Sequence, residues 1–394
     1  MEKYVLILIV LASTISCNTE NKKVTKKYTH ELKIGDSIVL PNPNNGHFMT
    51  WNSQITKFNN QKILSRLKYK GKRGIEYFDL NNEKHITTQI FETEGNQGLG
   101  NVSNYFIISE DSIAIFNDRQ LLLTNKDLKI LEVYNYMDNY DKLWYILQDS
   151  NKGQVVFKNN KLYFGKADFE YTNSNAFYSS KISTEIDLAT GEFIEHTSMT
   201  FPKSYFDKCW GNYTTRINRD YNHKNDNFIY SFPTNHNLFV FDPFEDKLKN
   251  TIEAKSVFLP EEFESMNCKH YDDYDREREY YLKTGKYLKI LHDPYQDIYY
   301  RFVELPMNDE DVIYYTGRAD ALYSTEIAVM ILDHNLNVIG ETKLPKNTYI
   351  NWDFFILEDG LYISANNPNN ENYDEDKLVY HRFIVDNKNK PTTL

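Results

Sequence analysis

The stretch LKILHDPYQDIYYRF (288–302) decides the fold, although its His292 and Asp293 first suggest a catalytic site. A short apolar strand leads into a tight turn that contains Asp293 and Pro294, and a second strand rich in aromatic residues follows. This order is typical of an antiparallel β-hairpin. We therefore interpret the His-Asp pair as part of a turn and not as catalytic residues.

The same hairpin pattern occurs five more times along the chain. Each copy has a short apolar strand, a polar turn of Asn, Asp, Gly or Pro, and a second strand that alternates apolar and polar residues. The six copies start 48–73 residues apart. The other five are FNNQKILSRLKY from Phe58, FIISEDSIAIFN from Phe106, VVFKNNKLYFGK from Val155, FIYSFPTNHNLFVFD from Phe228 and FFILEDGLYISAN from Phe354.

A second hairpin with an Asp or Asn in its turn follows each of the first five hairpins. Four antiparallel strands per unit, repeated radially, predict an all-β, six-bladed β-propeller. The spacings beyond the usual ~40–50 residues of a propeller repeat indicate insertions. The last unit offers only three strands, and we expect the strand DSIVLP (36–41) to complete it and close the ring. The only long helical candidate is 261–283.

The N-terminus is typical of an exported protein. The basic start MEK, the apolar run YVLILIVLA and the small residues before Cys17 form a secretory signal that is too short to span a bilayer. A Cys after small residues favours a bacterial lipoprotein, although Thr14 stands where such signals usually carry Leu. We predict a signal peptide at 1–16, lipidated Cys17, a flexible tether at 17–30 and the propeller at 31–394. An ordinary signal peptide with an incidental Cys is the alternative.

The composition bears on partners and on the compartment. A net charge of −11 argues against nucleic acid, whose phosphates require clustered Lys and Arg. The 31 tyrosines suit carbohydrate or peptide binding, although a compositional bias explains them as well. After Cys17 the chain has only Cys209 and Cys268, which could pair in an oxidising compartment.

At this point the sequence resembles a known group. The signal, the six irregular blades, EGNQGLG (94–100) and DPYQDIYYRF (293–302) are similar to six-bladed propeller lipoproteins of unknown function from Bacteroidetes, with a TolB-like propeller architecture. The resemblance implies a propeller in the cell envelope, anchored by lipid to the outer membrane. It implies no catalytic residues. It leaves open whether the protein faces the periplasm or the cell surface.

The long insertions fall on one face of the predicted propeller. Connections from strand two to strand three and from blade to blade share a face, and loops this long are usually functional or disordered. Cys209 and Cys268 lie in the two blade-to-blade loops that flank blade four, which makes a disulfide between them a hypothesis, with free, separately buried thiols as the alternative. The five insertions are 165–183, 204–226, 259–285, 305–325 and 365–376.

No catalytic, metal or cofactor motif emerges from the sequence. Cys268, His270, Asp272 and Asp273 offer metal ligands, but their spacing fits neither a zinc site nor a calcium loop. The glycines of GNQGLG (95–100) are in the wrong order for a dinucleotide loop. No GxSxG nucleophile motif is present. We predict no catalytic residue, no metal and no cofactor.

The long loops are rich in aromatic residues and arginine, the composition of binding hot spots. The alternative is that these side chains pack the loops onto the propeller. The candidate ligand- or partner-binding residues are Trp210, Tyr213, Arg216, Arg219, Tyr221, His223, His270, Arg276 and Arg318, accompanied by Tyr271, Tyr274 and Tyr315.

Three functions follow as hypotheses. The first is a lipid-anchored envelope propeller that binds a glycan, a peptide or an envelope protein on its loop-rich face. The second is a propeller-type glycan lyase or hydrolase, and the third is a structural docking ring of an envelope complex. An enzyme should show converging acids, histidines or a metal at the axis. A binding protein should show an exposed aromatic-arginine patch, and a docking ring should show a flat apolar patch on the blade edges.

Overall fold

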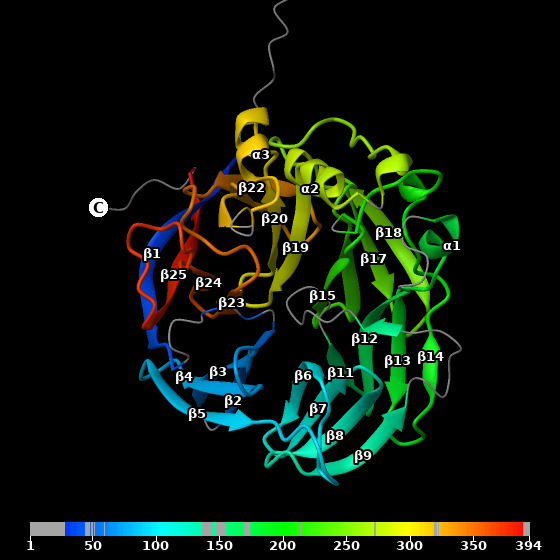
Figure 1. The fold of residues 1–394 in the computed structure, drawn as a ribbon, viewed down its shortest axis with the longest axis vertical. Coiled ribbons are helices and arrows are strands. Elements are labelled where there is room, and N and C mark those ends of the chain that lie inside the picture. The colour runs from blue at the N-terminus through cyan, green and yellow to red at the C-terminus, as the bar shows by residue number, and fades with distance from the viewer. Residues whose placement is uncertain are drawn as a thin grey trace, which may run out of the picture.

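The computed structural model of the chain describes residues 28–43, 48, 50, 52–58, 60–135, 144–146, 155–168, 174–212, 214–271, 273–318, 321 and 323–388. These residues are mostly β-strand, and their antiparallel sheets follow one another around a ring, so that they resemble the blades of a propeller (Figure 1). The predicted all-β class with four-stranded antiparallel units is confirmed at this level.

Three of the sheets have four strands in sequence order. The first contains β2 (Ser53–Phe58), β3 (Gln61–Lys68), β4 (Gly74–Asp79) and β5 (Lys84–Ile90). The second contains β6 (Val102–Ser109), β7 (Ser112–Asn117), β8 (Gln120–Asn125) and β9 (Ile130–Asn135). The third contains β15 (Asn218–Asn222), β16 (Asn227–Ser231), β17 (Asn237–Asp242) and β18 (Lys247–Glu253).

The two remaining sheets are larger. The five-stranded sheet contains β10 (Trp144–Ile146) and β11 (Val156–Lys158), which both pair with β12 (Lys161–Asp168), then β13 (Ser183–Asp187) and β14 (Phe193–Glu195). The eight-stranded sheet runs in the order β19 (Lys286–Asp293), β20 (Ile298–Glu304), β21 (Ile327–Leu332), β22 (Val338–Lys343), β1 (His30–Pro41), β25 (Lys377–Asn387), β24 (Gly360–Ser364) and β23 (Phe354–Leu357).

The N-terminal strand pairs with the last strand of the chain. β1 runs antiparallel to β25 from the pair His30–Asn387 to the pair Pro41–Lys377. The prediction that 36–41 forms a strand beside the last unit is confirmed. β1 meets β22 through a single parallel pair, His30 with Gly340.

Carboxylates at strand ends shape the hairpin turns. In the stretch 288–302, Asp293 Oδ1 accepts hydrogen bonds from the backbone N–H groups of Tyr295 (2.9 Å) and Gln296 (3.1 Å). The hydroxyl of Tyr300 donates to Asp293 Oδ2 at 3.2 Å. Such local bonds explain why Asp is favoured in these turns. Asp293 therefore holds the turn, as the sequence predicts, but His292 and Asp293 themselves are the last two residues of strand β19 and not turn residues.

One predicted hairpin was assigned to the wrong pair of strands in its blade. The hairpin that starts at Phe228 is β16–β17, the second and third strands of its sheet, and not the first and second. The first strand, β15, lies inside the predicted loop 204–226. All five residues of this strand (NRDYN) are buried although four are strongly polar. Pairing with neighbouring strands makes that burial possible. Arg219, for example, donates to the Tyr230 hydroxyl at 2.7 Å.

The helices are short and lie between strands: α1 (Asn175–Tyr178), η1 (Lys203–Tyr205), η2 (Cys268–His270), α2 (Tyr274–Lys283) and α3 (Asp309–Tyr315). The expected long helix at 261–283 is therefore only α2, preceded by the single turn η2. Asp273 starts α2 because its side chain accepts from the N–H groups of Asp275 and Arg276, both at 3.1 Å. No helix among the described residues is long and apolar enough to cross a membrane.

Candidate binding face

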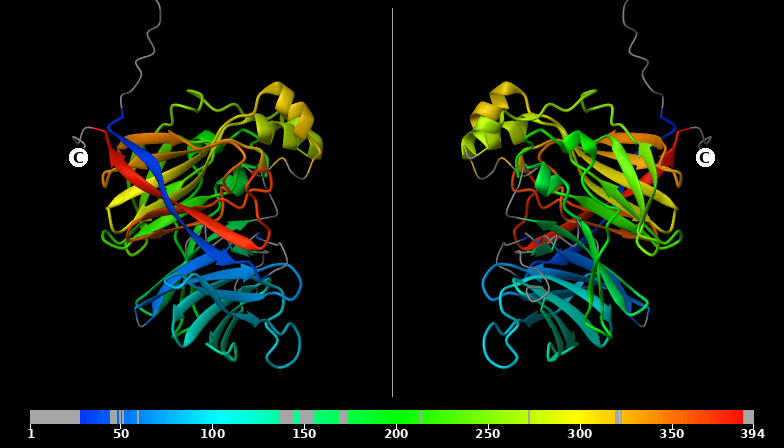
Figure 2. Two further views of the ribbon diagram at one scale, coloured as in Figure 1. Left: turned by 90° about the vertical axis from the view of Figure 1, so that its left-hand side faces the viewer. Right: turned by 90° about the vertical axis from the view of Figure 1, so that its right-hand side faces the viewer.

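Five connections between strands lie on one side of the ring, and we call them the loop layer. In Figure 2, α2 and α3 (yellow) and the β24–β25 connection (orange-red) lie on the same side of the sheets. The loop layer contains the described parts of residues 169–182, 196–217, 254–285, 305–326 and 365–376.

Direct contacts join the first three segments of the loop layer. Asn175 Nδ2 donates to Asp207 Oδ1 at 2.7 Å, which links 169–182 to 196–217. The structure joins Cys209 to Cys268 by a disulfide with a Cα–Cα distance of 5.3 Å, which links 196–217 to 254–285. The backbone N–H of Met266 also donates to the carbonyl oxygen of Cys209 at 2.9 Å. These three segments are therefore bonded to one another.

The remaining two segments are attached in the same way. The Arg278 guanidinium on α2 donates to the carbonyl oxygen of Arg318. Asn367 Nδ2 in the β24–β25 connection donates to the carbonyl oxygen of Tyr323 at 2.8 Å, and Asn369 Nδ2 donates to Ser324 Oγ at 3.1 Å. The five connections therefore belong to a single continuous layer, although residues 218–226 of the predicted insertion 204–226 form β15 and the turn after it and lie outside this layer.

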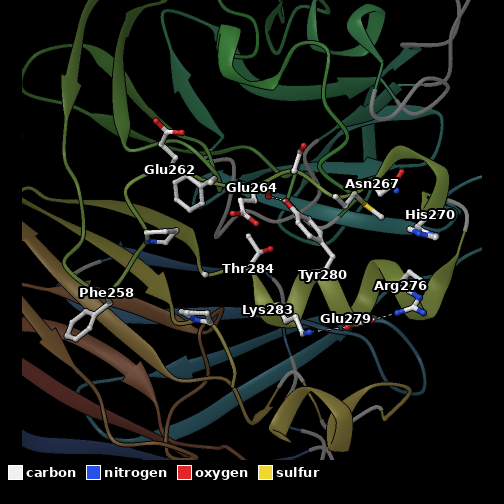
Figure 3. Close-up of a pocket in the computed structure, with 16 residues that line it drawn as sticks. Phe258, Glu262, Glu264, Asn267, His270, Arg276, Glu279, Tyr280, Lys283 and Thr284 are labelled. Carbon is white, nitrogen blue, oxygen red and sulfur yellow. Dashed lines mark hydrogen bonds and ion pairs between the residues drawn. The ribbon is translucent and has the colours of Figure 1, made fainter. Parts of the chain in front are cut away.

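A pocket of about 600 Å³ lies within the loop layer, between the chain at 258–267 and α2. Such a volume falls in the range of ~300–1,000 Å³ typical of ligand sites. The charged residues Arg276, Glu279 and Lys283 of α2 line one side of the pocket (Figure 3). Its apolar walls are formed by Phe258, Pro260, Phe263, Met266, Tyr280 and Pro306.

The wall at 258–267 is held in place by hydrogen bonds. His236 Nε2 lies 3.1 Å from the carbonyl oxygens of Pro260 and Glu261. The Tyr280 hydroxyl on α2 donates to the carbonyl oxygen of Glu264 at 3.0 Å, and burial raises the pKa of Tyr280 to about 12. The pocket is thus preformed by fixed contacts on both of its sides.

Some of the charged side chains around the pocket form ion pairs with each other, and others do not. Glu279 Oε2 accepts from Arg276 at 2.9 Å, Glu279 Oε1 lies 3.1 Å from Lys283 Nζ, and Lys283 also lies 3.1 Å from Asp309. Hydrogen bonds from Lys283 and then Arg276 lower the pKa of Glu279.

By contrast, the side chains of Glu262 and Glu264 are exposed. Neither carboxylate has an ion pair or hydrogen bond with a residue that the structure describes. The uncompensated charge at the pocket is therefore negative.

Beside the pocket, α2 and α3 lie together and form an exposed ridge, which we call the α2–α3 crest (Figure 1). Ile313, Tyr274 and Tyr314 are 79%, 60% and 58% exposed. The Arg318 guanidinium lies over the Tyr314 ring, 4.6 Å from its centroid. With Arg276, these five residues make the crest an exposed patch of aromatic, aliphatic and arginine side chains.

Three of the predicted binding residues are instead structural. Trp210 is 1% exposed and belongs to an aromatic core cluster, where its Nε1–H donates to the carbonyl oxygen of Tyr205 at 3.2 Å. Arg219 is fully buried in β15 and lies over the Phe228 ring at 3.9 Å. Tyr221, in the same strand, is also buried. Their burial corrects the prediction that these side chains meet a ligand.

The other predicted residues divide by position. His223 is exposed, but it lies in the β15–β16 turn, at the end of β15 opposite to the loop layer. Arg216, His270, Arg276 and Arg318 are exposed parts of the loop layer, and His270 and Arg276 line the pocket. They stay predictions as binding residues. Tyr213 and the lipidation site Cys17 lie outside the described residues.

The pocket residues Phe263, Tyr280, Glu262 and Glu264 are not among the binding residues predicted from sequence. The signal was present, since LPEEFES (259–265) places acids and an aromatic residue together inside a predicted insertion. In the part of the chain that the structure describes, no group of three or more His, Cys, Asp or Glu residues could hold a metal ion.

Antiparallel sheets around a ring and a one-sided loop layer with a pocket in it define a propeller-like protein. Residues 22–343 match the family model described as a domain of unknown function, DUF4221, and the chain belongs to that family. A comparison with curated proteins returned no match.

Two solved structures are similar to the chain. The crystal structure of a DUF4221 member from Bacteroides vulgatus is 22% identical, with a TM-score of 0.79 over 92% of this chain and 100% of the other. A Bacteroides fragilis protein described as exported is 13% identical, with a TM-score of 0.50 over 91% and 97%. The resemblance to propeller-like Bacteroides proteins of unknown function is thus confirmed at the level of family and fold.

Proposed function

We propose that this protein is an exported, lipid-anchored, six-bladed propeller of the cell envelope that binds a protein partner or other ligand through its loop layer. The six-blade count is supported by the division of the eight-stranded sheet at its weakest point. β22 and β1 share one residue pair there, and four strands lie on either side. In this arrangement β1 is the outer strand of the last blade and closes the ring, as in TolB-like propellers.

The envelope location is supported by three features. The signal peptide at 1–16 precedes Cys17, which would carry the lipid and hold the protein at the outer membrane. The Cys209–Cys268 disulfide suits an oxidising compartment outside the cytoplasm. The similar Bacteroides fragilis protein is described as exported.

The observation that carries the binding function is the α2–α3 crest. Tyr274, Ile313 and Tyr314 present exposed apolar and aromatic side chains in the loop layer, and Arg276 and Arg318 on the crest are exposed as well. Aromatic and arginine side chains dominate binding hot spots because they bury a large area while losing little conformational freedom. This is the feature expected of a binding protein.

The docking-ring hypothesis has one specific observation in its favour. Leu131 and Val133 on the outer strand β9 are both exposed, and residues two apart in a strand face the same side. They offer a small apolar patch on a blade edge, which makes this patch the natural comparison site. A partner held at the blade edges would require it.

Co-isolation of partners with paired variants tests the proposal. The affinity-tagged protein is purified from solubilised membranes of cells that produce it naturally, as wild type, as Ile313→Asp with Tyr314→Ser, and as Leu131→Asp with Val133→Ser. We expect the crest variant to lose its specific partner and the blade-edge variant to keep it. Loss of the partner only in the blade-edge variant would favour the docking ring and contradict the proposal.

A further inference from the structure

We infer that the pocket beside the crest binds a basic side chain of a peptide, a lysine or arginine whose neighbours are apolar. This inference rests on the proposed function, because it names the chemistry that a partner presents to the loop layer. It is carried by three observations: the shape of the pocket, the aromatic character of its walls and the sign of its uncompensated charge.

The pocket is a built cavity and not a gap between mobile loops. The Cys209–Cys268 disulfide fixes one end of the wall at 258–267, and the two carbonyl contacts of His236 fix it near the other end, at Pro260 and Glu261. The backbone N–H of Met307 donates to the carbonyl oxygen of Leu282 at 3.0 Å, which fixes the C-terminal end of α2 against the next connection. A preformed cavity needs little ordering when a ligand binds.

The walls favour an apolar stem or an aromatic neighbour. Phe258, Phe263 and Tyr280 contribute aromatic rings, and aromatic faces attract cations as well as apolar groups. A lysine or arginine side chain combines both properties, because an aliphatic stem carries the charged group. An acidic side chain would gain nothing from these rings.

The charge of the pocket selects a cation. Lys283 and Arg276 already pair with Glu279, and Lys283 also pairs with Asp309, so the cations at the rim are compensated. Glu262 and Glu264 have no such partner among the described residues. Figure 3 shows the paired row on α2 and the two glutamates across the pocket from it. A cation entering the pocket would complete the charge pairing.

Calorimetric titration of the purified full-length chain in detergent tests the inference. The probes are acetyl-Phe-Lys-Phe-amide, acetyl-Phe-Glu-Phe-amide and spermidine, the last a cation that lacks aromatic neighbours. We expect the lysine peptide to bind most tightly, and its affinity to fall with salt because the attraction is between charges. Equal binding of the glutamate peptide would overturn the inference, and equal binding of spermidine would overturn the assignment to a peptide.

Two variants locate the binding. Glu262→Gln combined with Glu264→Gln removes both charges and keeps the size of the side chains, and we expect the affinity for the lysine peptide to fall roughly tenfold. Glu310→Gln removes an exposed charge on α3 outside the pocket and should leave the affinity unchanged. Circular dichroism checks that both variants are folded.

The result also separates this inference from the proposed function. If the lysine peptide does not bind, or binds the double variant equally well, the inference fails. The co-isolation of a partner through Ile313 and Tyr314 would then still support the proposed function. If the peptide binds as expected but the crest variant keeps every partner, the inference about the pocket is supported and the proposed binding role of the crest is wrong.

Discussion

His236 Nδ1 lies 2.7 Å from the hydroxyl oxygen of Tyr287, while Nε2 of the same ring lies 3.1 Å from the carbonyl oxygens of Pro260 and Glu261. One imidazole therefore connects an inner strand of the ring, β19, to the wall of the pocket. The Arg301 guanidinium completes this junction. It lies over the Tyr287 ring at 3.3 Å and donates to the carbonyl oxygen of His236 at 2.8 Å.

This junction predicts that the stability of the protein depends on pH. Burial, aided by the nearby charges of Arg301 and Lys255, lowers the pKa of His236. A histidine whose pKa is lower in the folded state binds protons preferentially when unfolded. Its contribution is therefore complete above the unfolded pKa of about 6.5 and is lost as the pH falls through that value.

Urea unfolding at pH 7.5, 6.5 and 5.5 measures this effect. We expect the decrease in stability toward pH 5.5 to be smaller in His236→Gln than in the wild type, because the glutamine does not titrate. His334→Gln, in an exposed turn, is the control for replacing a histidine elsewhere in the chain. Because each variant shares every other histidine with the wild type, the difference between their slopes of stability against pH reports only the replaced histidine. Identical slopes in His236→Gln and the wild type would refute this role.

The disulfide predicts a large redox effect. Cys209 and Cys268 are 59 residues apart, and the chain-entropy model gives a stabilisation of about 4 kcal/mol for a closed loop of that length. Cys209→Ser combined with Cys268→Ser should lose much of this free energy of unfolding. A reducing agent should lower the stability of the wild type and leave the double variant unchanged. Equal sensitivity of the two proteins would show that the pair does not hold the loop layer.

A buried ion pair supports the base of α2. Lys286 and Glu304 pair with side chains that are each 2% exposed, and Asn351 Nδ2 donates to Glu304 Oε2 at 3.0 Å. Burial lowers the pKa of Lys286 in spite of this pairing. Glu304→Gln would leave a buried cation without its counter-ion, which costs roughly 3–5 kcal/mol.

The matched control for this pair is Glu326→Gln. Glu326 lies 2.6 Å from Lys343, and both side chains are partly exposed. Solvent screening reduces the value of such a pair to below about 1 kcal/mol. Chemical denaturation should therefore separate the two variants clearly. A similar small loss in both would mean that the buried pair is dispensable.

The contrast between Trp210 and Tyr314 separates stability from binding. Trp210→Ala removes a side chain from the aromatic core and should cost roughly 3–5 kcal/mol of stability. Tyr314→Ala removes an exposed side chain and should change the stability by no more than about 0.5 kcal/mol, while it weakens partner binding. Thermal unfolding and co-isolation measure the two effects. A stable Trp210→Ala protein that lost its partner would restore Trp210 as a binding residue.

Hairpins were predictable from sequence wherever local chemistry specifies them. The turn at Asp293 and the strand at 36–41 both follow from alternation and from turn residues, and both are found. β15 was not predictable, because its polar sequence NRDYN is buried only through partners that lie elsewhere in the chain. Asp220, for example, accepts from the backbone N–H of His292 at 2.7 Å, across 72 residues of sequence.

The loop layer shows the same contrast between what local sequence predicts and what depends on the fold. Strand order alone predicts which side of the ring carries the insertions. It also predicts that Cys209 and Cys268 lie on that side. Which aromatic residues face solvent depends on how the loops fold over the blades. The sequence therefore grouped Trp210 and Tyr274 together as loop aromatic residues, although Trp210 is buried in the core and Tyr274 is exposed.

The most direct test of the central claim is photo-cross-linking in cells that produce the protein naturally. A photoreactive amino acid replaces Ile313 on the α2–α3 crest or Leu131 on the edge strand β9, two positions of comparable chemistry on different surfaces. Binding through the loop layer predicts a discrete cross-linked partner at position 313 and none at position 131. A partner captured at position 131 but not at position 313 would contradict it.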